Sequence, residues 1–331
     1  MRKALRVIGW SFGVLGVLML GGLVYFGVAY PKKQDPPAIE IEATPERLAR
    51  GEYLFRNVAA CAECHSPQRR ELAGAPIDEA RLGAGGTPFA LGSAGTLYAK
   101  NITRAGIGDW TDGEIVRTLR DGVSRDGGAL FPLMPYTNYR QLSEFDLHAL
   151  VAYLRTLEPR ASEVPERELH FPMSLIIRLM PSPAGPYPPA PLHANAVEYG
   201  RYLVTAASCG DCHSPMDDRG QPLPGRAFAG GNPFPTGDGW TAHSANITPD
   251  SATGIGAWSR ERFVATFKAR EPERSAPRPL GPVERRSPMP WLSYSGMTED
   301  DLGAIYDYLR TIDPVRHEVV RFVREEPATP E

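Results

Sequence analysis

A five-residue pattern, Cys-x-x-Cys-His, occurs twice in this chain of 331 residues and uses all four of its cysteines. The two copies are Cys61-Ala62-Glu63-Cys64-His65 and Cys209-Gly210-Asp211-Cys212-His213. Four cysteines are too few for a disulfide scaffold in a chain of this length. Each pair of thiols is therefore expected to carry its own chemistry, together with the histidine that follows it.

Other short patterns recur in the same order around the two copies. The matching segments are 51–54 with 200–203, 101–103 with 246–248, 106–110 with 254–258, 134–135 with 289–290, and 153–159 with 308–314. This repeat predicts two homologous domains, 44–160 and 193–316. A proline-rich linker, 161–192, joins them as a semi-rigid spacer. Residues 270–286, present only in the second copy, are expected to form an exposed insertion, and the charged tail 317–331 is expected to be frayed.

The N-terminal segment has the length and composition of a membrane anchor. Arg2, Lys3 and Arg6 precede residues 7–30, which carry no charge. As a helix this stretch would measure about 36 Å, enough to cross a hydrocarbon core of about 30 Å. A cleaved secretory signal has a shorter apolar part and a small-residue cleavage site, so the sequence favours an uncleaved anchor over residues 1–31.

The remaining pattern predicts an all-α chain. Thr44, Thr111, Ser143, Ser259 and Thr298 each stand where a helix N-cap is expected, and apolar residues follow at helical spacing. No comparable alternating strand pattern is present in the sequence.

The Cys-x-x-Cys-His motif is the signature of covalent attachment of c-type haem. Two thiols on one helical turn can form thioethers with one porphyrin, while the adjacent imidazole reaches the iron. A thioredoxin-like redox pair does not need the histidine, and a zinc site would join two knuckles over a short loop rather than about 150 residues. The sequence thus predicts two haem c groups, attached at Cys61 and Cys64 and at Cys209 and Cys212.

The repeat also predicts the second axial ligand of each iron. Of eight methionines, only Met134 and Met289 occupy matching positions, and each lies in a loop framed by prolines. Proline stiffens such a loop, which suits a weak bond between thioether and iron. We expect the axial pairs His65 with Met134 and His213 with Met289.

Two further residue pairs are duplicated, Asn101 with Asn246 and Trp110 with Trp258. Turn formation and packing explain them most simply. The alternative is that they form hydrogen bonds with a haem propionate or its surroundings.

On these motifs the chain resembles the membrane-anchored multihaem cytochromes c of bacteria, in particular the cytochrome c subunits of quinoprotein alcohol dehydrogenase and of gluconate-type dehydrogenases. The resemblance implies two tandem class I cytochrome c domains with His/Met ligation. It also implies a location on the periplasmic side of the inner membrane and electron transfer from a dehydrogenase subunit toward quinone or a terminal oxidase. Those subunits usually carry three haem motifs, whereas this chain has two.

Charge and ligation restrict the function further. The chain has 36 basic and 39 acidic residues, which does not indicate nucleic-acid binding. The alternative to an electron carrier is an enzyme such as a dihaem peroxidase or oxidase, which needs an open or displaceable distal position on an iron. Methionine at both distal positions favours the carrier.

Overall fold

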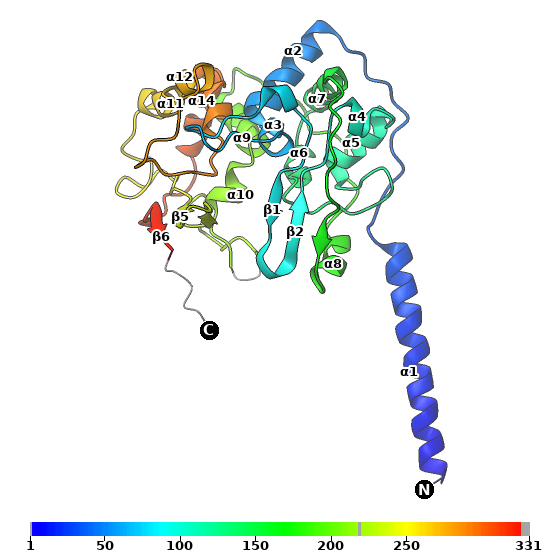
Figure 1. Cartoon of the computed structure of the whole chain (residues 1–331). Helices are drawn as coiled ribbons and strands as arrows, with labels where there is room; N and C mark the ends of the chain where they lie inside the picture. The colour runs from blue at the N-terminus through cyan, green and yellow to red at the C-terminus, as the bar shows by residue number, and fades with distance from the viewer. Residues whose placement is uncertain (1, 218–219, 326–331) are drawn as a thin grey trace.

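The computed structural model describes residues 2–217 and 220–325 and shows a mostly helical chain (Figure 1). Helices dominate, as predicted, but two small sheets are also present. The α-helices are α1 (Arg2–Ala29), α2 (Pro45–Tyr53), α3 (Cys61–His65), α4 (Arg104–Ile107), α5 (Asp112–Asp121), α6 (Tyr136–Tyr139), α7 (Glu144–Thr156), α8 (Met173–Ile176), α9 (Ala196–Ala206), α10 (Cys209–His213), α11 (Arg260–Lys268), α12 (Glu271–Ser275), α13 (Trp291–Ser295) and α14 (Glu299–Leu309). The short π- and 3₁₀-helices are η1 (Leu54–Val58), η2 (Glu79–Arg81), η3 (Gly92–Ala94) and η4 (Ile177–Leu179).

Helix α1 projects from the rest of the chain (Figure 1). Its 28 residues give a length of about 42 Å. Within it, Ile8–Ala29 is long and apolar enough to cross a membrane, and most of its apolar side chains are exposed. Length and composition therefore make α1 a candidate membrane span.

The helix starts follow the predicted caps. The side chains of Thr44, Thr111, Ser143, Ser259 and Thr298 each accept a hydrogen bond from the backbone N–H three residues later. Each cap satisfies an N–H that the helix itself leaves unpaired.

Two equivalent helix pairs form the core, α2 against α7 and α9 against α14. A repeated glycine permits each close approach. A Cβ on Gly51 would lie 2.0 Å from the carbonyl oxygen of Ala149, and a Cβ on Gly200 would lie 1.9 Å from that of Ala304. Packing of backbone against backbone thus explains why glycine recurs at these two positions.

Each copy of the repeat also contributes strands to a three-stranded antiparallel sheet. The strands are β1 (Pro88–Ala90), β2 (Gly95–Tyr98) and β3 (Glu168–Leu169) in the first sheet, and β4 (Pro233–Pro235), β5 (Trp240–His243) and β6 (Phe322–Arg324) in the second, each sheet in that order. Strand β3 lies within the expected linker and β6 within the expected tail. The expectation of a frayed tail is therefore wrong for β6, where Thr241 of β5 pairs with Val323. Residues 326–331 lie outside the described residues.

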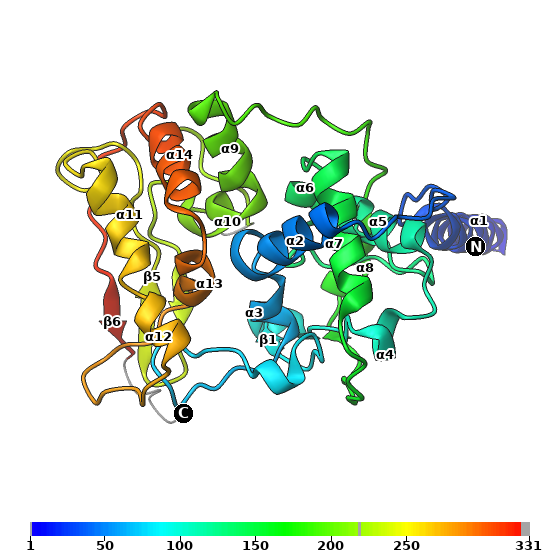
Figure 2. The same cartoon turned by 90° about the horizontal axis from the view of Figure 1, so that it is seen from above.

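The elements gather on two sides of the molecule when it is seen from above (Figure 2). Those of residues 31–192, here called the first half, lie on one side, and those of residues 193–325, the second half, lie on the other. Two tyrosines cross the seam between the halves in equivalent ways. The Tyr53 hydroxyl donates to Asp301 Oδ2 (2.5 Å), and the Tyr202 hydroxyl donates to Asp146 Oδ2 (2.6 Å).

The insertion 270–286 is exposed for most of its length, but it also contacts the first half. Arg274 Nη1 donates to Asn57 Oδ1 (2.7 Å), and the Ala73 backbone N–H donates to the Arg278 carbonyl (2.9 Å). The insertion therefore joins the two halves in addition to the tyrosines.

Candidate functional site

The two Cys-x-x-Cys-His motifs form equivalent single-turn helices, α3 and α10. The chain enters each turn through a residue in the left-handed region, Ala60 at φ +48° and Ser208 at φ +55°. Non-glycine residues adopt this conformation uncommonly, so its recurrence at both turns marks a shared local geometry. All four cysteines carry free thiols.

Both histidines are held through the same ring nitrogen. His65 Nδ1 lies 2.8 Å from the Lys100 carbonyl oxygen, and His213 Nδ1 lies 2.7 Å from that of Ala245. Burial lowers the pKa of both imidazoles, which favours the neutral ring. A neutral ring that donates its Nδ1–H to a carbonyl presents Nε2 as a metal ligand, with its orientation fixed.

The thiols are not poised as redox nucleophiles. Burial, followed by the charge of the neighbouring cysteine, raises the pKa of Cys61 and of Cys209 to about 12. Cys64 and Cys212 keep contact with solvent, yet desolvation by the protein around each thiol raises its pKa to about 11. A thioredoxin-like pair needs a lowered thiol pKa, so these environments argue against that alternative.

The two methionine loops share one backbone geometry. Pro135, after Met134, has φ −80° and ψ 54°, and Pro290, after Met289, has φ −77° and ψ 63°. In each loop the residue after the proline donates its N–H to the methionine carbonyl, at 2.7 and 2.8 Å. These values describe an inverse γ-turn with proline at its centre. The sequence predicted stiff loops but not this turn.

A tyrosine five residues after each methionine connects its loop with the adjacent cysteine turn. The Tyr139 hydroxyl donates to the Ala59 carbonyl (3.2 Å), and the Tyr294 hydroxyl donates to the Ala207 carbonyl (2.8 Å). Both tyrosines are buried. Sequence reasoning missed them, although their matching positions in the repeat were a usable signal.

The two candidate sites face one another across the seam. Asn138 Nδ2 in the first half donates to Asp211 Oδ2 (2.9 Å), and Ser293 Oγ in the second half donates to Glu63 Oε1 (2.6 Å). Glu63 and Asp211 are the equivalent third residues of the two cysteine turns, and burial raises the pKa of both carboxyls. Each cysteine turn is therefore bonded to the helix that follows the methionine loop of the other half, α10 to α6 and α3 to α13.

The duplicated asparagines have structural partners. The Oδ1 atoms of Asn101 and Asn246 each accept from the backbone N–H two residues later, at 2.9 and 3.0 Å. Their Nδ2 atoms donate to backbone carbonyls that follow the last helix of each repeat. Trp110 and Trp258 pack against the hydrophobic core. These contacts favour the structural interpretation of both pairs.

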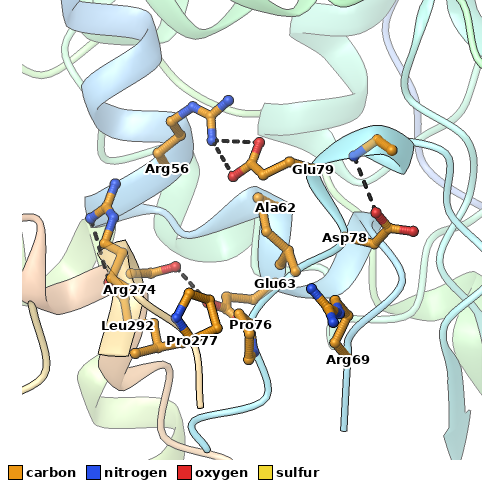
Figure 3. A pocket seen from close by; sticks show the side chains of 13 residues that line it. Arg56, Ala62, Glu63, Arg69, Pro76, Asp78, Glu79, Arg274, Pro277 and Leu292 are labelled. Carbon is orange, nitrogen blue, oxygen red and sulfur yellow. Dashed lines mark hydrogen bonds and ion pairs between the residues drawn. The ribbon is translucent and has the colours of Figure 1, made fainter. Parts of the chain in front are cut away.

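A cavity of about 270 Å³ opens at the seam behind α3 (Figure 3). Its charged groups have protein partners: Arg56 donates twice to Glu79, and Arg274 donates to Asn57. None of the eight predicted site residues lines it. Ala62 and Glu63 of α3 border the cavity, but the predicted haem-binding side chains lie outside it.

The residues of each copy fit a covalently attached haem. They supply two thiols on one turn and a neutral imidazole with Nε2 available. They also supply a methionine in a loop whose following helix is joined by a tyrosine hydroxyl to the residues just before that turn. Across the part of the chain that the structure describes, no three His, Cys, Asp or Glu side chains are grouped to hold a metal ion. The zinc alternative therefore gains no support.

Comparison with known proteins gives relatives at about 30% identity. The chain is 32% identical to a diheme cytochrome c-type protein of Cereibacter sphaeroides, over 91% of this chain and 97% of the relative. It is 30% identical to the cytochrome c subunit of alcohol dehydrogenase (quinone) of Gluconobacter oxydans, over 93% of this chain and 61% of the relative. It is also 30% identical to a subunit of the nicotinate dehydrogenase of Pseudomonas putida, over 92% of this chain.

The extent of these matches differs among the relatives. This chain spans 25% of the length of the nicotinate dehydrogenase subunit and about three fifths of the alcohol dehydrogenase subunit, whereas it spans nearly all of the diheme cytochrome. No family model matches the chain.

Proposed function

Because this chain belongs to the c-type cytochromes, the family of its diheme and dehydrogenase-subunit relatives, we propose that it is a membrane-anchored electron carrier with two haem c groups. The names of these relatives confirm the expectation of an electron-transfer protein and do not favour the peroxidase or oxidase alternative. The observation that carries the proposal is the duplicated site: two Cys-x-x-Cys-His turns whose imidazoles are bonded through the same ring nitrogen, and two methionine loops of one geometry.

We assign the same roles to the residues of each copy. The cysteine thiols would form the thioether links, and the imidazole Nε2 and the methionine sulfur would bind the iron. When bound, each haem supplies a one-electron Fe(III)/Fe(II) couple. The residues of the first copy are Cys61, Cys64, His65 and Met134, and those of the second are Cys209, Cys212, His213 and Met289.

The chain around these residues adjusts the site. The carbonyls of Lys100 and Ala245 orient the imidazoles. Methionine ligation and burial of the site both raise a reduction potential. The bonds of each cysteine turn to the other half, Asp211 to Asn138 and Glu63 to Ser293, support an electron relay within one chain rather than two independent carriers.

In this proposal the repeat corresponds to two tandem class I cytochrome c domains, 44–160 and 193–316. Equivalent helix pairs, equivalent sheets and equivalent cysteine turns support that division. The linker 161–192 carries α8 and β3, and β3 pairs with β2 of the first half.

The anchor and the partners complete the proposal. Helix α1 spans the bacterial inner membrane, with Arg2, Lys3 and Arg6 on the cytoplasmic side and both haem sites in the periplasm. The electron donor is a dehydrogenase subunit, and the acceptor is quinone or a terminal oxidase. The names of the relatives, which include alcohol and nicotinate dehydrogenase subunits, support a dehydrogenase donor.

Replacing the methionines tests the ligand assignment. Met134→Ala should let carbon monoxide bind one of two ferrous haems and lower its potential, and Met289→Ala should do the same for the other haem. Met216→Ala is the matched control, because Met216 is exposed and has no methionine at the equivalent position of the first copy. If neither ligand variant alters carbon monoxide binding or potential, the distal assignment is wrong.

A further inference from the structure

An apolar face is exposed on the segment that contains α8 and η4. Phe171 is 80% exposed, Leu175 42%, Ile176 39% and Leu179 52%, whereas Ile177 is buried at 1%. These four exposed side chains are here called the α8 face. Because Ile177 is buried, the segment packs against the rest of the protein, and the α8 face is a surface of a packed segment.

The segment is attached to the end of the candidate membrane span. Arg178 Nη2 donates to the carbonyls of Gly27 (2.9 Å) and Tyr30 (2.6 Å), and its guanidinium lies 5.7 Å from the centre of the Phe26 ring. Gly27 is within the span and Tyr30 follows its last residue, Ala29. Arg178 thereby satisfies carbonyls that the end of α1 leaves unpaired.

A second contact fixes the segment from the side of the first sheet. His170 donates its backbone N–H to the Ala94 carbonyl and its ring Nδ1–H to the Ser93 carbonyl, both at 3.0 Å. Figure 1 shows α8 beside the loop between β1 and β2, at the end of the body from which α1 projects. The segment is therefore held between the anchor and the body of the protein.

The neighbouring residues are those typical of a membrane interface. The span has Trp10 near one end and Tyr25 near the other, and both are exposed. Such aromatic residues are enriched at the headgroup level. Exposed Lys32 and Lys33 follow the span and can attract anionic lipid headgroups. Because Arg178 is bonded to carbonyls at the end of the span, the α8 segment would lie at the boundary between headgroups and acyl chains.

We propose that the α8 face is inserted into this boundary of the bilayer as a second, non-spanning membrane contact. The inference rests on the proposed span of α1. Burial in lipid would remove the apolar surface of the α8 face from water, which is favourable. The contact would hold the first half against the membrane in one orientation, instead of leaving it on a flexible tether.

Photo-crosslinking of the full chain in lipid nanodiscs tests the proposal. The chain is matured with its haem and placed in phosphatidylethanolamine and phosphatidylglycerol. Phe171→p-benzoylphenylalanine, a replacement of similar shape, and Leu179→p-benzoylphenylalanine report on the α8 face. The same replacement at Leu18 reports on the span, and at Val283, 82% exposed in the insertion, on a surface in water. Intact-mass analysis identifies the adduct.

We expect phospholipid adducts at Phe171 and Leu179 in several-fold higher yield than at Val283. A lipid adduct at Leu18 without one at Phe171 or Leu179 would overturn the proposal while leaving the span intact. Protein adducts at Phe171 and Leu179 would overturn it in favour of a covering protein. Absence of lipid at Leu18 would instead remove the proposed span, and the docking inference with it.

Discussion

The seam between the halves contains two tyrosines with equivalent bonds but unequal surroundings. Burial, followed by the charge of Asp301, raises the pKa of Tyr53, so its hydroxyl stays protonated and donates to that buried carboxylate. Tyr202 donates in the same way to Asp146. Asp146 also accepts two hydrogen bonds from Arg50, both at 2.8 Å, whereas no second side-chain donor to the Asp301 carboxylate is found among the described residues.

This difference predicts an unequal loss of stability. Tyr53→Phe should lower the free energy of unfolding by about 1–3 kcal/mol, because it leaves a buried carboxylate without its donor. Tyr202→Phe should cost about 1 kcal/mol or less, since Arg50 still pairs with Asp146. Urea unfolding of each variant in detergent measures both losses. Equal losses, or a larger loss for Tyr202→Phe, would contradict this account of the seam.

At the scale of single residues, the sequence predicted which side chains bind haem but not the hydrogen-bond partners that orient them. The motif identified cysteines and histidines by residue type, and the repeat selected Met134 and Met289. His65 is bonded to the backbone carbonyl of Lys100, and His213 to that of Ala245. Every residue has a backbone carbonyl, so the sequence cannot indicate which one accepts the bond. The ligand assignment itself stays a prediction.

At the scale of elements, the insertion 270–286 is organised by one arginine. Arg278 donates to both carboxylate oxygens of Glu284, at 2.6 and 2.7 Å, and its carbonyl accepts from Ala73 of the first half. The hydrogen bonds from Arg278 are the main cause that lowers the pKa of Glu284 from 4.5 to about 2. The exposed ion pair thus shapes a loop that contacts the other half.

The pKa shift predicts how this loop responds to acid. Because the pKa of Glu284 is lower in the folded chain, its contribution is present above its ordinary pKa of 4.5 and is lost as the pH falls through about 2. A ¹³C NMR titration, with the signal assigned through Glu284→Gln, should give a value near 2. Arg278→Lys keeps the charge but loses the paired N–H groups, so it should move the pKa part of the way back. A native value near 4.5 would contradict the paired geometry.

The helices could be predicted from sequence patterns, whereas the two sheets could not. The N-caps at Thr44 and Thr111 and the helices they begin were predictable, because cap and apolar spacing are local signals. The sheets were not, since their strands contain two to four residues, too few for an alternating pattern. Strand β6 also pairs with β5 about 80 residues away, so nothing near Val323 in the sequence indicates its partner.

At the scale of the whole molecule, the repeat becomes an approximate two-fold arrangement. Each half contributes a tyrosine that bonds to an aspartate of the other half. Each cysteine turn also accepts a hydrogen bond from the helix that follows the methionine loop of the other half, α6 or α13. The sequence predicted two similar units but not how they meet. Some residues that the seam joins are more than 200 positions apart, such as Glu63 and Ser293, and the period of a sequence pattern does not indicate such a contact.

The proposed function requires that each of the two cysteine turns holds one haem. Intact-mass measurement of the denatured chain, purified from cells that mature c-type cytochromes, counts these haems, because thioether links survive denaturation. We expect the mass of the polypeptide plus two haem groups, and plus one in the double variant Cys209→Ser, Cys212→Ser. A wild-type chain that carries one haem, or none, would contradict it.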